Sequence, residues 1–214
     1  MDTPRANLNK EFNLRELREG DLDPSPFRQF QKWFEEALKA DPVYANAMTL
    51  ATANRGGKPS ARMMLLKGFD EDGFVFYTNS ESNKGEDLGQ NPRAALVFWW
   101  SQLERQVRIE GRVEKVSDEE ADSYFRTRPK GSQLGAWASQ QSRVIRSREV
   151  LDNRMEELEA KYSDVDVPRP PYWLGYRLVP ESIEFWQGRP NRLHDRLRYR
   201  LVKDGSWIIE RLAP

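Results

Sequence analysis

The sequence predicts an α+β fold in which a mostly antiparallel sheet closes into a barrel and helices lie at its periphery. Strand-like runs follow one another with hairpin turns between them, such as Asn54-Arg55-Gly56-Gly57 and Asp70-Glu71-Asp72-Gly73. Patterns of helical period interrupt these runs mainly late in the chain. Because consecutive strands joined by short turns pair antiparallel, this order favours a barrel over a doubly wound parallel sheet.

The first half of the chain supplies one long helix and several strands. Ser25-Pro26 is a typical helix start, and apolar residues from Phe27 to Leu38 recur at helical spacing. Strands are predicted over 47–53, 60–69 and 74–78, a short helix over 84–90, and further strands over 94–100 and 106–116. The run 94–100 is continuously apolar and should be buried on both faces, whereas 106–116 alternates and should be half-buried.

The second half begins with helices and ends with strands. Ser117-Asp118-Glu119-Glu120 is a capping box and predicts a helix that runs through Arg126. Residues 128–142 are predicted to form a loop, and 143–162 a long helix whose apolar face holds Leu151, Met155, Leu158 and Tyr162. Strands are predicted over 173–178, 182–187, 197–203 and 207–211, with Asp204-Gly205 in the last hairpin. Residues 1–22 are predicted to form a flexible arm before a single domain, residues 23–214.

Composition narrows the class of function. The chain has 34 Lys and Arg residues against 34 Asp and Glu, which argues against binding to nucleic acid or to an anionic membrane. There is no cysteine and one histidine, so disulfides, thiolate chemistry and metal centres are not expected. No stretch approaches the about 20 apolar residues of a membrane span, and the first residues contain no apolar signal sequence. The expected location is the cytoplasm.

Common phosphate and nucleophile motifs are missing. The chain contains no G-x-G-x-x-G, no G-x-x-x-x-G-K-[ST] and no G-x-S-x-G, and Gly56-Gly57-Lys58 is followed by Pro59. A bound phosphate would therefore have to be held by side chains at strand ends and in loops. Taken singly, each candidate also fits an ordinary structural role; the candidates are Arg62, Lys67, Thr78, Lys84, Tyr124, Arg128, Ser132, Gln141 and Ser142. The last two precede the predicted helix 143–162, whose N-terminal amides would help to hold an anion.

The positions of Arg62 and Lys67 conflict with a simple strand. They are five residues apart, so strict alternation places their side chains on opposite faces. Both reach one site only if the strand bulges or twists, if Lys67 lies beyond the strand end, or if different subunits use the two residues.

The segment Glu184–Arg196 concentrates arginines around the single histidine. Five arginines and one aspartate lie between Gly188 and Arg200, and His194 stands between Arg192 and Arg196. Like-charge repulsion disfavours protonation of His194, which should be neutral at pH 7. Arginines beside Trp186 suit a planar anionic aromatic ligand, and Arg192 and His194, two residues apart, would share one face of an extended segment. The alternative is a strand end with solvated arginines and a surface histidine.

Six pieces of the chain stand in order over about residues 45–214: ARMMLLKGFDEDGFVFYTN, SNKGEDLGQNPRAAL, LERQVRIEG, YFRTRPKGSQLGAWASQQS, IEFWQGRPNRLHDR and the terminal ERLAP. Taken together, these pieces resemble the pyridoxamine 5′-phosphate oxidase family. The resemblance implies an FMN-binding split β-barrel with peripheral helices. It also implies a homodimer with non-covalent FMN at the subunit interface. The implied activity is oxidation of pyridoxamine 5′-phosphate and pyridoxine 5′-phosphate to pyridoxal 5′-phosphate, with molecular oxygen reduced to hydrogen peroxide.

The resemblance also implies roles for individual residues. The FMN contacts would be Arg62, Met63, Met64, Leu65, Leu66, Lys67, Tyr77, Thr78, Asn83, Lys84, Gln106, Gln141, Ser142, Trp186 and Arg196. Substrate contacts would be Lys67, Tyr124, Arg128, Ser132, Arg192, Leu193 and His194, of which Arg192 and His194 are the expected catalytic residues.

The chain departs from the family pattern in two places. Asn83 stands where relatives carry an arginine, in Ser82-Asn83-Lys84. Asn9-Lys10-Glu11-Phe12 stands where relatives carry an Arg-Arg-Glu-Tyr lid. Two alternatives therefore stay open: a split-barrel FMN oxidoreductase with another substrate, and a non-catalytic protein that binds FMN or pyridoxal phosphate.

Overall fold

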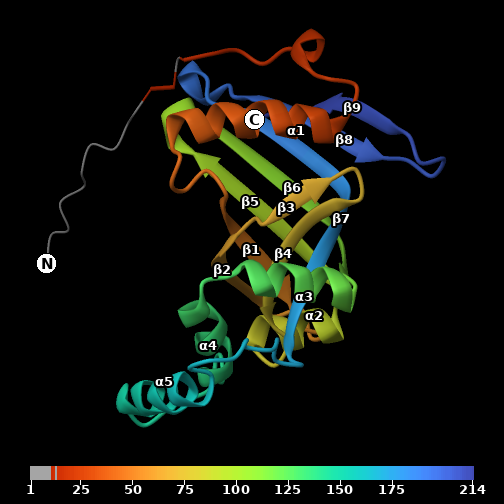
Figure 1. Ribbon diagram of the computed structural model, residues 1–214. Helices are drawn as coiled ribbons and strands as arrows, with labels where there is room; N and C mark the ends of the chain where they lie inside the picture. The colour runs from red at the N-terminus through yellow and green to blue at the C-terminus, as the bar shows by residue number, and fades with distance from the viewer. Residues whose placement is uncertain (1–10, 13) are drawn as a thin grey trace, which may run out of the picture. The chain divides into compact units, whose positions relative to one another are not determined.

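The computed structural model describes residues 11–12 and 14–214, and Figure 1 shows their helices and strands. The strands form a sheet with the order β2-β1-β5-β6-β7-β4-β3, and β8 and β9 continue it from β7. The pairings of β3 with β4, of β4 and β8 with β7, and of β8 with β9 are all antiparallel. The predicted α+β class with an antiparallel sheet is confirmed.

The contacts of the chain divide it into two compact units. One, here called the terminal unit, comprises Met1–Met48, Leu96–Glu110 and Glu181–Pro214; the other, here called the central unit, comprises Thr49–Ala95 and Gly111–Pro180. Strands β1 (Ala47–Ala53), β5 (Arg93–Trp100), β6 (Arg105–Lys115) and β7 (Trp173–Gln187) contribute residues to both.

The terminal unit is built around the helix α1 (Pro26–Ala40). It begins after Ser25, whose side chain accepts a hydrogen bond from the Arg28 N–H, as the sequence predicts. Its buried rings meet the sheet: Phe30 packs on Phe98, and Trp33 on Phe185 with ring centroids 5.1 Å apart. The other elements are η1 (Glu19–Asp21), η2 (Ser101–Leu103), η3 (Pro190–Arg192), β8 (Asp195–Leu201) and β9 (Trp207–Arg211).

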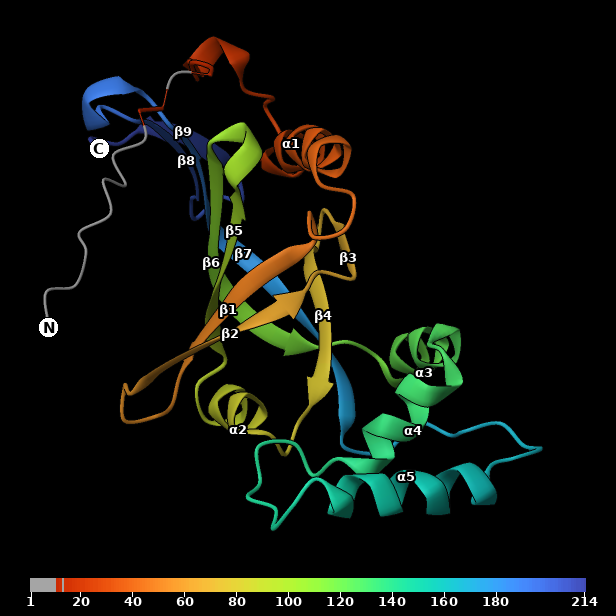
Figure 2. The same ribbon diagram turned by 90° about the vertical axis from the view of Figure 1, so that its left-hand side faces the viewer.

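The central unit holds the remaining elements. They are β2 (Pro59–Leu65), β3 (Gly68–Asp70), β4 (Gly73–Asn79), α2 (Asn83–Gln90), α3 (Asp118–Thr127), α4 (Lys130–Ala138) and α5 (Glu149–Lys161). Figure 2 shows α5 running beside α4. Buried residues of α3, α4, α5 and β7 form a core that includes Phe125, Leu134, Leu158 and Trp173. Of the apolar side chains predicted for 143–162, Met155, Leu158 and Tyr162 contact this core, whereas Leu151 does not belong to it, and the helix begins only at Glu149.

Two predicted strand boundaries are wrong. The predicted strand 60–69 is two strands, β2 and β3, and Leu66 and Lys67 lie between them. Of the options for Arg62 and Lys67, the structure confirms that Lys67 lies beyond the end of β2. Conversely, the predicted strands 173–178 and 182–187 are one continuous strand, β7. The middle of β7 passes close to β6, because a Cβ on Gly111 would lie 2.0 Å from the Val179 carbonyl oxygen.

Two further predictions from the sequence are wrong. The predicted loop 128–142 contains the helix α4. The sequence does not indicate this helix, because Gly131, Ser132 and Gly135 have low helix propensity. Its buried residues Gln133 and Leu134 show that tertiary packing stabilises it. Strand β5 is not buried on both faces, because its burial alternates and Trp99 is 50% exposed.

The predicted flexible arm lies partly outside the described residues, namely at 1–10 and 13, where Asn9 and Lys10 fall. Of the remainder, Leu17 is buried and its N–H donates to Asp195. Among the described helices, none is both long and apolar enough to cross a membrane.

Candidate functional site

The central unit contains a buried ammonium group surrounded by neutral oxygens. Lys84, in the first turn of α2, is 7% exposed. Its Nζ donates to Gln141 Oε1 at 2.9 Å and to Thr78 Oγ1 and Ser82 Oγ, each at 3.1 Å. Burial, and secondarily the charge of Arg62, lower the pKa of Lys84 to about 8. A buried cation with only neutral partners is costly, so this site favours an anion.

Arg62 provides a second cation in the central unit. Its Nη1 donates to Leu50 O and to Thr52 Oγ1, and its Nη2 to Ser60 Oγ. Thr52 in turn donates to Asp87 Oδ2 at 2.7 Å. Burial lowers the pKa of Arg62, and the charge of Asp87 acts in the opposite direction. Arg62 is therefore fixed on β2 through hydroxyl and carbonyl oxygens, without a direct carboxylate contact among these bonds.

A pocket of about 380 Å³ gathers predicted cofactor and substrate residues of the central unit. The predicted residues that line it are Met64, Tyr77, Thr78, Arg128, Ser132 and Gln141. Arg128 Nη1 is buried and has no hydrogen-bond partner among the described residues. Its guanidinium carbon lies 4.9 Å from the centroid of the Trp173 ring. Such an orphaned donor costs free energy unless a ligand satisfies it.

Aromatic stacking holds the wall of this pocket. Tyr77 stacks on Tyr124 and on Trp173, with ring centroids 4.2 and 5.0 Å apart. Burial, followed by the charge of Glu120, raises the pKa of Tyr77 to about 12, so its hydroxyl stays protonated. Tyr124 thereby acts on the pocket through Tyr77.

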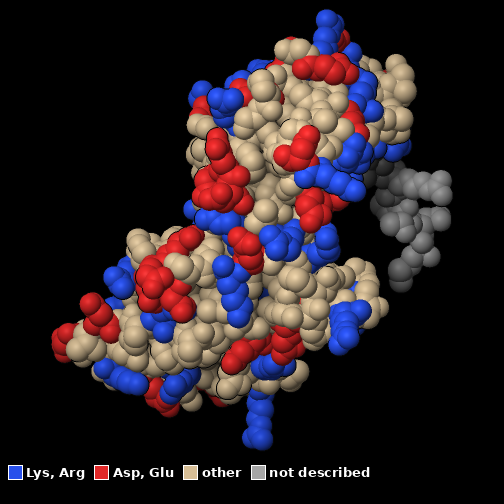
Figure 3. Space-filling view, turned by 90° about the vertical axis from the view of Figure 1, so that its right-hand side faces the viewer, with Lys and Arg blue, Asp and Glu red and all other residues tan. Residues whose placement is uncertain are grey.

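A larger cavity of about 900 Å³ in the same unit shares Asn79 and Gln141 with this pocket. Arg143, Trp137 and Tyr172 are among its other lining residues. On the face in Figure 3, basic and acidic residues are interspersed, so positive charge there is local rather than spread over a broad patch.

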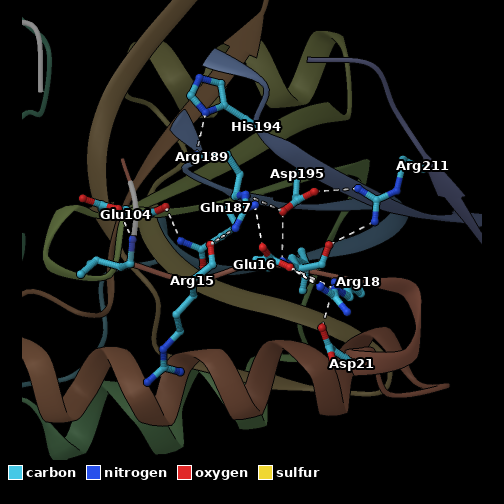
Figure 4. A network of polar contacts seen from close by, with 12 residues as sticks. Arg15, Glu16, Arg18, Asp21, Glu104, Gln187, Arg189, His194, Asp195 and Arg211 are labelled. Atoms are coloured by element: carbon cyan, nitrogen blue, oxygen red, sulfur yellow. Dashed lines mark hydrogen bonds and ion pairs between the residues drawn. The ribbon is translucent and has the colours of Figure 1, made fainter. Parts of the chain in front are cut away.

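In the terminal unit, His194 lies among aromatic rings. Its ring centroid is 4.6 Å from that of Trp186 and 5.7 Å from that of Phe12. Figure 4 shows its Nδ1 facing Arg189, whose backbone N–H donates to it at 3.1 Å. Burial, and then Arg192, lower the pKa of His194, so the expected neutral form is supported, although burial is the larger cause. With Nδ1 accepting, the neutral ring carries its proton on Nε2.

Arg196 is anchored by a buried carboxylate. Its Nε and Nη2 donate to the two oxygens of Glu184 at 2.8 and 3.1 Å, and its Nη1 donates to Ala213 O. The Glu184 contact raises the pKa of Arg196. This fork fixes the guanidinium on the β7–β8 pair, where Trp186 faces Arg196 in register.

Two predicted arrangements are wrong. Ser142 does not precede a helix, because α5 starts at Glu149; instead Ser142 has a positive φ of 72° in a turn. Arg192 and His194 do not share an extended segment. Pro190–Arg192 is a 3-10 turn in which Asn191 and Arg192 have φ of 56° and 62°.

The remaining predicted residues are less constrained. Most of them are exposed, namely Met63, Leu65, Lys67, Asn83, Ser142, Arg192 and Leu193. Leu66 is buried, and Gln106 lies half-buried on β6. Sequence reasoning missed Glu184 and Arg143, which bond to predicted residues or to their neighbours. Arg189 was counted among the arginines around His194 but was given no role of its own. A carboxylate two strand positions before Trp186 was the available signal for Glu184; Arg143 gave none.

The comparisons with known proteins identify the family of the chain. Residues 34–162 match the family described as pyridoxamine 5′-phosphate oxidase, and residues 173–214 match the pyridoxine 5′-phosphate oxidase C-terminal dimerisation region. A relative from Gloeothece citriformis, named pyridoxine/pyridoxamine 5′-phosphate oxidase, is 62% identical over 100% of both chains. One of the same name from Cupriavidus necator is 58% identical over 99% of this chain and 100% of its own.

Solved structures share the fold. PhzG from Burkholderia lata 383, in complex with tetrahydrophenazine-1-carboxylic acid, superposes with a TM-score of 0.88 at 31% identity, covering 96% of this chain and 100% of its own. A pyridoxamine 5′-phosphate oxidase-related, FMN-binding protein from Nostoc punctiforme gives a TM-score of 0.71 at 20% identity, covering 90% of this chain and 100% of its own. The chain therefore belongs to the pyridoxamine 5′-phosphate oxidase family and has its split β-barrel fold.

Proposed function

We propose that this protein, as a homodimer with FMN, oxidises pyridoxamine 5′-phosphate and pyridoxine 5′-phosphate to pyridoxal 5′-phosphate, with molecular oxygen reduced to hydrogen peroxide. The observation that carries this proposal is the buried Nη1 of Arg128, which has no partner within residues 11–12 and 14–214 and lies in a pocket whose wall is aromatic. A phosphorylated pyridine ring offers both an anion for the guanidinium and a flat ring for the aromatic wall.

The central unit suits the phosphate of FMN. Lys84 is a buried cation whose partners are a hydroxyl pair and an amide oxygen, and Arg62 lies near enough to affect its pKa. A phosphate would supply the negative charge that these cations lack. FMN, when bound, supplies the acceptor for the two electrons that leave the substrate carbon.

The substrate phosphate would bind at Arg128 and Ser132. Both line the 380 Å³ pocket, and the exposed Lys67 adds a mobile cation. Tyr124 stacks on Tyr77, which forms part of the aromatic wall against which the pyridine ring would pack. Charge-assisted hydrogen bonds of this kind are worth roughly 1.5–3 kcal/mol each.

The family resemblance assigns the reacting ring to residues of the terminal unit, and their own contacts define the roles that each could have there. His194 carries its proton on Nε2, so it can donate to a polar substituent of the pyridine, and Arg192 can pair with that substituent when it is anionic. Arg196, fixed by Glu184, would stabilise negative charge that develops on the cofactor ring. Trp186 would pack beside it.

A homodimer is supported by the dimerisation region matched at 173–214. In the central unit, the edge strand β2 also exposes Met63 and Leu65, at 65% and 44%. Burying these side chains against a second copy would be favourable. We assign the FMN sites to that interface, as the family resemblance implies.

The decisive experiment mixes the pure FMN-loaded protein with pyridoxine 5′-phosphate in air-saturated buffer and follows pyridoxal 5′-phosphate and peroxide. Equimolar formation of both products is expected. Protein that binds neither added FMN nor the vitamers would overturn the proposal. Tight FMN without turnover of either vitamer would instead favour another substrate, such as a reduced aromatic carboxylic acid like the ligand held by the PhzG relative. Binding of pyridoxal phosphate without turnover would favour a carrier.

A further inference from the structure

The proposed cofactor phosphate site has few positively charged donors that can contact a phosphate directly. A phosphate monoester carries about −1.5 to −2 charges at pH 7. Lys84 contributes one ammonium, and its own neighbour in the chain, Asn83, is a neutral exposed amide. Arg62 keeps its charge near this site, but its Nη1 and Nη2 already donate to Leu50, Thr52 and Ser60 on the sheet.

Arg143 brings a further guanidinium to this place from a distant part of the chain. Its Nη2 donates to the Glu81 carbonyl oxygen at 3.2 Å and to Glu86 Oε1 at 2.5 Å. Glu81 and Glu86 flank Asn83, so the guanidinium lies along the first turn of α2, which begins at Asn83. The guanidinium of Arg143 therefore lies beside Asn83, whose own side chain carries no charge.

A tight turn places Arg143 there. The Arg143 N–H donates to Gln140 O at 3.0 Å, and Ser142 between them has a φ of 72°, which is uncommon for a serine. The same turn carries Gln141, whose Oε1 accepts from Lys84 Nζ. One short segment thus delivers an amide to Lys84 and a guanidinium to α2.

The guanidinium of Arg143 can exchange its partner Glu86 for another anion. The side chains of Arg143 and Glu86 are 50% and 46% exposed, so their ion pair is weakly stabilising in water. Both bonds use Nη2, and Arg143 also lines the 900 Å³ cavity that shares Gln141 with the smaller pocket. A doubly charged phosphate could therefore bind the donors on Nε and Nη1, or replace the single exposed carboxylate at Nη2.

We propose that Arg143 is a cofactor-binding residue that supplies to the FMN phosphate the positive charge that Asn83 does not carry. This inference rests on the proposed function, because it assumes that FMN binds with its phosphate at Lys84. It adds a residue outside the set that the family resemblance assigns.

The test titrates the apoprotein with FMN and with riboflavin, which lacks the phosphate, and follows the quenching of flavin fluorescence. Arg143→Ala should weaken FMN binding about tenfold, as expected for one charge-assisted contact, and leave riboflavin binding unchanged. Arg146→Ala removes an exposed arginine from the same loop and is the matched control; it should change neither affinity. Unchanged FMN binding in Arg143→Ala, or an equal loss of FMN and riboflavin, would overturn the inference.

A second set of variants tests whether an arginine at position 83 can replace Arg143 in binding the FMN phosphate. Asn83→Arg should restore FMN affinity in the Arg143→Ala background and should tighten binding less when Arg143 is present. Equal effects of Asn83→Arg in both backgrounds would show that Arg143 does not serve this phosphate. Wild-type protein that binds FMN while Arg143→Ala is unaffected would overturn only this inference, whereas wild-type protein that binds no FMN would overturn the proposed function as well.

Discussion

The basic residues of the two units face different partners. In the central unit, Lys84 bonds to neutral oxygens, and Arg128 Nη1 has no partner among the described residues. In the terminal unit, arginines are paired with carboxylates: Arg196 with Glu184, Arg189 with Glu16, and Arg211 with Glu19 and Asp195. Figure 4 shows several of these pairs in one network.

This difference separates two uses of a cation. A carboxylate partner neutralises an arginine and fixes the segment that carries it, whereas a buried cation without one is costly and favours an incoming anion. The central unit also holds paired arginines, since Arg169 bonds to Asp118 and Asp122. A buried cation without a carboxylate partner is therefore a candidate anion ligand in either unit. Arg143 is the exception among the paired arginines, because its ion pair with Glu86 is exposed and lies beside Asn83 in the first turn of α2.

The largest expected effect is at Arg128. Arg128→Ala should lower kcat/KM for pyridoxine 5′-phosphate by about tenfold to a hundredfold, because one charge-assisted hydrogen bond is worth roughly 1.5–3 kcal/mol. The rate measured with unphosphorylated pyridoxine should be the same in the variant and the wild type. Arg126→Ala, at an exposed position of the same helix, is the control. Equal losses with both substrates would mean that Arg128 does not bind the substrate phosphate.

The next effect concerns pH and Lys84. Burial lowers the pKa of Lys84 to about 8, so the free protein loses this positive charge as the pH rises through 8. A bound phosphate favours the protonated form, and the FMN dissociation constant should rise with pH above that point, by at most about tenfold per pH unit. Titrations at several pH values in wild type and Lys84→Met test this; the variant should bind FMN more weakly and lack the slope.

Unfolding of the protein at high pH would not explain the weaker FMN binding above pH 8, as far as Lys84 determines stability. The pKa of Lys84 is lowered from 10.5 to about 8 in the folded chain, so between these values the unfolded chain binds more protons. The contribution of this group to stability then increases with pH over that interval. A parallel fall in thermal stability and FMN affinity would contradict the assignment of the slope to Lys84.

A smaller effect is expected at His194. Burial and Arg192 lower its pKa below 6.5, so the neutral ring that accepts from the Arg189 N–H is present at pH 7 and is lost on acidification. Turnover should therefore fall as the pH drops through this pKa, and His194→Asn should remove that acid limb. Both His194→Ala and Arg192→Ala should affect turnover more than FMN retention. If these variants lose flavin but turn over normally after reloading with FMN, His194 and Arg192 bind the cofactor rather than the substrate.

The smallest effect is expected at an exposed paired arginine. Arg148 bonds to Asp152 at 2.9 Å, and their side chains are 80% and 51% exposed. Arg148→Ala should cost about 0.3–0.5 kcal/mol, and calorimetry should show a Tm shift below about 2 °C with unchanged kcat/KM. A large loss of activity would mean that pairing is a poor guide to which arginines bind ligands.

Much of the fold follows from local patterns. The Ser25-Pro26 start of α1, the N-cap Ser117, and the hairpins at Gly73 and Gly205 are set by neighbouring residues, and the structure confirms them. The helix α4 was missed because its glycines and serines have low helix propensity, while the stabilising contact of Leu134 comes from distant residues. The break between β2 and β3 was also not visible, since it depends on pairing: the Lys67 N–H donates to Val75 O.

The candidate site was predicted only in part for the same reason. The family motifs named Lys84, Thr78 and Gln141, and the structure brings these three together. Neither motif nor period shows that Arg128 Nη1 lacks a partner or that Arg143 reaches α2, because both depend on how distant segments pack. The pairing of Glu184 with Arg196 depends on the register of β7 with β8.

The most direct test is a crystal structure of the protein grown with FMN and pyridoxal 5′-phosphate. The phosphate of FMN should lie within hydrogen-bond distance of Lys84 Nζ, and the phosphate of the vitamer should lie on Arg128 Nη1, while the pair of Arg196 and Glu184 stays intact. Phosphates bound instead at the carboxylate-paired arginines, such as Arg211, with Lys84 and Arg128 left empty, would contradict the assignment of the unpaired cations to anion binding.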